Sequence, residues 1–162
     1  MNTAATSPAA STLSLPTERE IRIERVFDAP RELVWRAHTE PELVRQWWGR
    51  GNRLDIERME VVRGGHWRYV EYHEGGSDGF EGRYREVTPP ERLVQTFEWD
   101  GMPGYVSIDT AEFVDLGDGR TKVIMTAAFL AREERDGMLQ SGMQQGLDQS
   151  YVHLDRLLTT LS

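Results

Sequence analysis

Cysteine is absent from the 162-residue chain, which excludes disulfides, thiolate zinc sites and a cysteine nucleophile. A chain without cysteine fits the reducing cytosol, so we expect a cytoplasmic protein. Basic runs are also absent: the net charge is -8 and the pI is about 5.0, which argues against nucleic acid as a partner because phosphate binding needs clustered Lys and Arg. No stretch approaches the ~20 consecutive apolar residues that cross a bilayer, so we expect no membrane insertion.

The composition is that of one globular domain. Apolar residues make up 38% and charged residues 28% of the chain, and its length suits a single core. Residues 1–19 are rich in Ala, Ser, Thr and Pro, and they lack the positive start and unbroken apolar run of a secretory signal. We therefore predict a disordered tail over residues 1–19 and a single domain over residues 20–162.

The domain opens with a strand and a short helix. The stretch EIRIERVFDAP alternates apolar and polar residues, as a strand with one covered face does, and this alternation places Arg25 on the covered side. Pro30 suits the first turn of a helix, which predicts a helix over Pro30–His38.

A second helix is predicted from HTEPELVRQWWG. Thr39 and Glu42 have the spacing of a capping box, and Gly49 is a typical helix stop. Neighbours on a helix point about 100° apart, so Trp47 and Trp48 extend two different faces. One ring can serve the core and the other a separate role.

From Leu54 to Phe129 the chain reads as about six strands separated by Gly, Pro and Asp, which indicates an antiparallel sheet built from hairpins. Alternation predicts an aromatic inner face, formed by Trp67, Tyr69, Phe80, Tyr84, Leu93, Phe97, Trp99, Ile108, Val123 and Met125.

The C-terminal segment carries the strongest helical pattern. Six apolar residues fall within a stripe roughly 80° wide, namely Met143, Leu147, Tyr151, Leu154, Leu158 and Leu161. Small residues at four-residue spacing flank the stripe, at Gly142, Gly146 and Ser150, and Arg132–Leu139 reads as a separate turn leading in. The order of elements indicates an α+β fold, in which a curved sheet and a single long helix leave space for a ligand cavity where they diverge.

Four stretches together resemble a known family: RVFDAPRELVWRAHTEPELVRQWWG, RGGHWRY, FEGRYREVTPPERLVQTFEW and MQQGLDQSYVHLDRLL. They resemble the helix-grip superfamily, also called START-like or SRPBCC, and within it the branch named after the C-terminal domain of the activator of Hsp90 ATPase. The resemblance covers roughly Glu20 to Leu161. It implies a curved antiparallel sheet of about six or seven strands around the C-terminal helix and an apolar cavity between them, but no universal activity, since relatives bind lipids, hormones and polyketides or act as cyclases.

No catalytic motif stands out. The four histidines His38, His66, His73 and His153 lack the spacing of a metal site, and no nucleophile elbow or phosphate-binding loop is present, so we expect no metal, no cofactor and no covalent chemistry. Arg25, on the covered side of its strand, either reaches solvent at the sheet end or anchors a ligand carboxylate, because an unpaired buried charge is costly. The same caution about a buried charge applies to Glu71, which shares its parity with Trp67 and Tyr69.

We therefore predict binding of a small hydrophobic or aromatic molecule in the cavity. Core packing alone explains many of the rings, but large rings facing a small-residue helix edge indicate a hollow. The predicted ligand-binding residues are Trp48, Trp67, Tyr69, Tyr84, Phe97, Trp99, Met125, Met143, Leu147 and Tyr151. Two alternatives stay open. One is a cyclase, hydratase or hydrolase acting on such a ligand, which requires a polar cluster in the cavity. The other is a chaperone-associated stress-response regulator that docks through its acidic surface or an exposed tryptophan. A homodimer is left open, as family members often pair.

Overall fold

The structure, a computed structural model, describes residues 11–162 as an eight-stranded sheet with four helices. The elements follow in the order β1 (Thr12–Ser14), β2 (Glu20–Phe27), α1 (Arg31–Thr39), α2 (Pro41–Val44), β3 (Arg53–Met59), β4 (His66–His73), β5 (Gly76–Thr88), β6 (Arg92–Trp99), β7 (Val106–Asp115), β8 (Thr121–Ala128), α3 (Arg132–Gln140) and α4 (Met143–Leu158). The predicted α+β class is confirmed.

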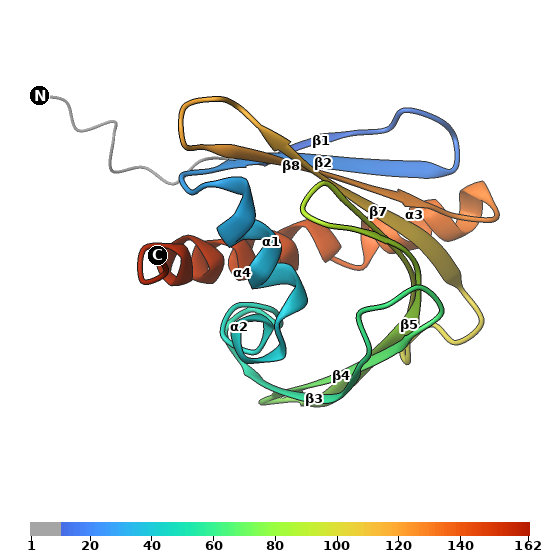
Figure 1. Ribbon diagram of the computed structural model, residues 1–162. Coiled ribbons are helices and arrows are strands. Elements are labelled where there is room, and N and C mark those ends of the chain that lie inside the picture. Colours follow the sequence, from blue (N-terminus) through green and yellow to red (C-terminus); the bar gives the residue numbers. More distant parts are fainter. Residues whose placement is uncertain (1–10) are drawn as a thin grey trace, which may run out of the picture.

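The strands form one antiparallel sheet in the order β1-β2-β8-β7-β6-β5-β4-β3. The sheet bends around α4, and α1 and α2 lie on the same side of the sheet as that helix (Figure 1). This is the helix-grip arrangement, with a slightly larger sheet than the six or seven strands expected. In the part of the chain that the structure describes, no helix is long and apolar enough to cross a membrane.

Strand β1 lies inside the segment predicted to be a disordered tail. Its three residues pair with β2, and Leu13 lies opposite Ile23 and packs against the core. The apolar Leu13 therefore attaches this short segment to the sheet edge, in spite of the polar composition around it. Residues 1–10 of the predicted tail lie outside the described residues.

The predicted capping box is wrong. Thr39 is the last residue of α1, and its hydroxyl donates to the Trp35 carbonyl at 2.9 Å, so it cannot cap the next helix. Helix α2 instead starts at Pro41 after Glu40, and it ends at Val44, well before Gly49. The chain continues through turns in which Gly49, Arg50 and Gly51 all have positive φ, at 89°, 61° and 82°.

The sheet's inner face carries the predicted residues with one exception. The prediction for Ile108 is wrong, because this residue lies on the outer face of β7 and is 44% exposed. Its neighbours Ser107 and Asp109 face inward instead, together with Ala111 and Phe113. The assignment failed because the inward residues of this strand begin with two polar side chains, which inverts the usual hydrophobic pattern.

Arg25 is buried and bound to α4. It donates to both carboxylate oxygens of Asp155, at 2.8 and 2.6 Å, and its guanidinium lies over the rings of Phe27 and Tyr151. The structure thus gives Arg25 a third role that the sequence did not suggest, because it ties β2 to the long helix.

Candidate ligand cavity

A cavity of about 380 Å³ lies between the inner face of the sheet and α4. Of the predicted ligand-binding residues, nine line this cavity: Trp48, Trp67, Tyr69, Phe97, Trp99, Met125, Met143, Leu147 and Tyr151. Tyr84 does not line it. This residue is buried in the core, with its hydroxyl close to that of Tyr69.

The two adjacent tryptophans have separate roles. Trp47 is 3% exposed, and its indole N–H donates to the Ala37 carbonyl at 2.8 Å, so this ring belongs to the core. Trp48 lines the cavity and packs edge-on against Tyr69 and Phe80, with ring centroids 5.2 and 4.9 Å apart. The division that the helical spacing predicted is therefore observed.

The small residues of the helical segment leave room beside the cavity. Gly142, Gly146 and Ser150 all line it. A Cβ at Gly142 would meet nothing within 4 Å, whereas one at Gly146 would lie 3.4 Å from the Arg50 side chain. The loop that carries Arg50 therefore approaches the helix closely at Gly146.

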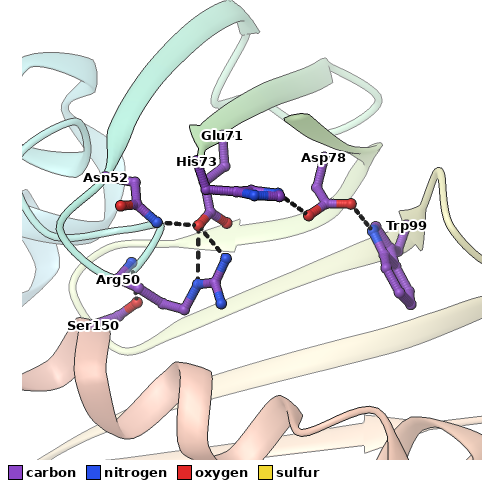
Figure 2. A network of polar contacts seen from close by, with 7 residues as sticks. All are labelled: Arg50, Asn52, Glu71, His73, Asp78, Trp99 and Ser150. Carbon is purple, nitrogen blue, oxygen red and sulfur yellow. Dashed lines mark hydrogen bonds and ion pairs between the residues drawn. The ribbon is translucent and has the colours of Figure 1, made fainter. Parts of the chain in front are cut away.

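Four residues form what we call the Glu71 cluster: Glu71, Arg50, Asn52 and Ser150 (Figure 2). One carboxylate oxygen of Glu71 accepts from Nε and Nη2 of Arg50 at 2.9 and 2.6 Å and from the Asn52 amide at 2.8 Å. The backbone N–H of Arg50 donates to the Ser150 hydroxyl at 2.9 Å. The Glu71 side chain is 4% exposed, so the cluster satisfies a buried charge while it joins the loop to β4 and α4.

Asp78, also in the cavity lining, is held by two neighbours. His73 Nε2 lies 2.8 Å from one of its oxygens, and the indole N–H of Trp99 donates to the other at 3.0 Å (Figure 2). Both oxygens of this carboxylate thus have partners, and the Trp99 ring is fixed in orientation.

Asp109 has fewer partners. It lies directly opposite Gln95 on β6, and both side chains line the cavity with Ser107. The Ser107 hydroxyl donates to Asp109 Oδ1 at 2.8 Å, and no other side chain in residues 11–162 donates to this carboxyl. Burial raises the pKa of Asp109 to about 7, even though the Ser107 hydrogen bond acts to lower it.

A carboxyl with this pKa exchanges its proton near neutral pH and can act as a proton donor or acceptor. With Ser107 and Gln95 it forms a polar cluster in the cavity, which the enzyme alternative requires. Sequence reasoning missed Ser107, Asp109 and Gln95. The available signal was the alternating series Ser107, Asp109, Ala111 and Phe113. The large apolar Phe113 marks this series as the inner face of the strand.

His38 also lines the cavity and is uncharged at neutral pH. Burial lowers its pKa to about 4, and its ring packs against Trp47 and Phe113. Over the described range no three His, Asp or Glu side chains gather in an arrangement that could hold a metal ion. The cavity therefore offers rings, methionines and a few hydrogen-bonding groups.

Solved structures of similar fold come from several bacteria. A protein of Rhodobacter sphaeroides is 27% identical, with 94% of this chain and 100% of that chain covered and a TM-score of 0.85. A protein of Nitrosomonas europaea is 25% identical, with 90% and 97% covered and a TM-score of 0.76. A solution structure from Arthrobacter aurescens, at 20% identity and a TM-score of 0.82 with 93% and 92% covered, supports the fold alone.

No curated protein matches the chain. The family model described as activator of Hsp90 ATPase homolog 1-like protein matches residues 28–159, which span α1 through α4 and all strands that line the cavity. The chain therefore belongs to the activator of Hsp90 ATPase homolog 1-like family, within the helix-grip superfamily.

Proposed function

We propose that the protein binds a small hydrophobic or aromatic molecule in the cavity between the sheet and α4. The observation that carries this proposal is the cavity itself, of about 380 Å³. Ligand pockets in proteins have volumes of about 300–1,000 Å³.

The chemistry of the wall supports an apolar guest. Rings from four different elements meet there, since Trp48 follows α2, Tyr69 lies on β4, Phe80 on β5 and Phe97 on β6. Phe80 and Phe97 pack at a tilt of 36° with their centroids 5.7 Å apart, and together they extend the aromatic surface. Binding would replace water against this surface with ligand carbon, at about 25 cal/mol per Å² of apolar area removed from water.

Polar groups are few but spread along the wall. The Glu71 cluster and the Asp109–Ser107 pair lie on β4 and β7, three strand spacings apart, which is about 14 Å along the sheet. A pocket of this kind, mostly apolar with isolated polar groups, fixes the orientation of its ligand through those groups.

The test uses N-phenyl-1-naphthylamine, an uncharged probe whose fluorescence rises in apolar surroundings. We expect saturable binding to the wild-type protein and at least ~10-fold weaker binding to Leu147→Trp. The indole is larger than the leucine side chain that it replaces on α4, so it should fill part of the cavity.

The matched control is Gln149→Trp, which adds the same ring to an exposed position of the same helix. This variant should bind the probe like the wild type, and thermal melts should show that both variants fold. Equal binding by Leu147→Trp and wild type, or no saturable binding at all, would contradict the proposal.

A further inference from the structure

The cavity wall carries an excess of negative charge. Three carboxyl groups line it, from Glu71, Asp78 and Asp109, and Arg50 is the single guanidinium among the lining residues that the structure describes. His38 adds no positive charge at neutral pH, because burial lowers its pKa to about 4.

Two of these carboxylates are already matched. Glu71 is bound by Arg50 and Asn52, and Asp78 is bound by His73 and Trp99. Arg50 uses Nε and Nη2 for the same Glu71 oxygen, so its charge is committed to that pair. An anionic ligand would have to compete with Glu71 for Arg50.

Asp109 has the fewest partners of the three carboxyl groups. Its partner is the uncharged Ser107 hydroxyl, and no nearby cation lowers its pKa against the effect of burial. Placing a carboxylate in an apolar cavity without a counter-charge is costly, and a cation that enters the cavity would remove that cost.

The aromatic wall favours the same kind of ligand. Trp67 packs with Tyr69 and Phe97 at centroid distances of 4.8 and 6.0 Å, and all three rings line the cavity. Ring faces attract organic cations, most strongly where the contact is shielded from water. A half-buried carboxyl in a cavity that several rings line is a combination that recognises an ammonium group on an apolar body.

We propose that the ligand is an organic cation, a protonated amine on an apolar or aromatic body, whose ammonium group lies against Asp109 while the body fills the ring-lined space. The inference rests on the proposed function, since it requires that the cavity admits a ligand. It adds the charge of the ligand and the residue that recognises that charge.

The test compares three probes of nearly equal size: 1-naphthylmethylamine, 1-naphthylmethanol and 1-naphthoic acid. Their dissociation constants would be measured by titration calorimetry at pH 7.5, where the amine is positive, the alcohol neutral and the acid negative. We expect the amine to bind at least ~10-fold more tightly than the alcohol, and the acid to bind most weakly.

Asp109→Asn keeps the side-chain shape and removes the negative charge. It should cost the amine its ~10-fold advantage while the alcohol binds within ~2-fold of wild type. The matched control is Glu112→Gln, which removes a carboxylate from the same strand, where Glu112 lies near Arg92 and is 45% exposed. This control should leave all three probes unaffected.

The outcomes separate the two proposals. If amine and alcohol bind equally well, the cation inference fails and the ligand-binding function stands. If the acid binds best, Arg50 and not Asp109 governs recognition, and the inference is again overturned. If none of the three probes binds, both proposals fail. The comparison of the three probes on the wild-type protein distinguishes these outcomes even if Asp109→Asn does not fold.

Discussion

Glu71 and Asp109 both belong to the inner face of one sheet and both line one cavity, yet their surroundings differ. Glu71 receives three charged or amide donors on one oxygen, whereas Asp109 receives one hydroxyl. The pairing at Glu71 satisfies a buried charge with protein groups. The carboxyl at Asp109 is left for a proton, or for a ligand, to neutralise.

By this difference Glu71 is a structural group, whereas Asp109 is the group that we propose to bind the ligand. The Glu71 cluster joins the loop after α2 to β4 and α4, so its hydrogen bonds contribute to the closure of the domain. Asp109 connects only to Ser107, two residues away on its own strand. Removing the two carboxylates should therefore change stability in opposite directions.

Arg50→Met should produce the largest effect. The substitution leaves Glu71 buried at 4% exposure with Asn52 alone, and breaking such a pair costs about 3 kcal/mol of unfolding free energy. Urea unfolding measures the change. Arg53→Met is the control, because Arg53 pairs with Asp55 at the surface at 71% exposure and its loss should cost far less. Equal losses in the two variants would show that the Glu71 cluster is not structural.

Asp109→Asn should stabilise the protein at high pH. The pKa of Asp109 is raised from 3.8 to about 7 on folding, so the folded state holds the proton more tightly and wild-type stability falls as pH rises from about 4 to 7. We expect the variant to be more stable than wild type by about 2 kcal/mol at pH 8, because solvent reaches the half-buried carboxyl and screens part of the ~4 kcal/mol that the full shift represents. The difference should vanish near pH 4. Urea unfolding at several pH values measures this gap.

Glu71→Gln is the matched comparison for that experiment, since it removes the same charge from the other polar group. It should lower stability at pH 8 because Arg50 loses its carboxylate partner. A destabilised Asp109→Asn, or a gap that does not change with pH, would remove the distinction between the two carboxyl groups.

Ser107→Ala should have the smallest effect, about 0.5–1 kcal/mol of unfolding free energy. The hydroxyl that it removes donates to Asp109 and acts to lower the pKa of Asp109, so this pKa should rise further above about 7 in the variant. Carboxyl chemical shifts followed by NMR against pH report the change. Thr110→Val, on the other face of the same strand, serves as control, and an unchanged Asp109 titration in Ser107→Ala would show that the hydrogen bond has no influence.

Much of the architecture was predictable because it depends on local periodicity. The C-terminal stripe around Leu147 and Tyr151 predicted a long helix, and the structure has α4 at Met143–Leu158. The four-residue spacing that separated Trp47 from Trp48 correctly assigned two different faces, although the helix behind that argument ends earlier, at Val44. The directions of the two indole rings were still predicted correctly, because the turns after α2 keep a helix-like hydrogen-bond spacing. The Trp48 N–H donates to the Val44 carbonyl at 3.0 Å.

The errors fell where distant segments decide. Thr39 had the spacing of a cap, but α1 continues through it and uses its hydroxyl. Ile108 was assigned to the inner face by its hydrophobicity, but the register of β7 with β6 and β8 points it outward. Because Ile108 was placed on the inner face, its neighbour Asp109 was placed on the outer face, and its position in the cavity was missed.

The sequence by itself determined the α+β class, the long helix and the aromatic character of the inner face, because these follow from periodicities of 3.6 and 2 within short stretches. The tertiary structure alone decided that Asp109 lines the cavity with the Ser107 hydroxyl as its side-chain donor, while Glu71 pairs with Arg50. Which face of a strand is inner, and which charges meet, depends on strand register and on loops that come together from distant parts of the chain.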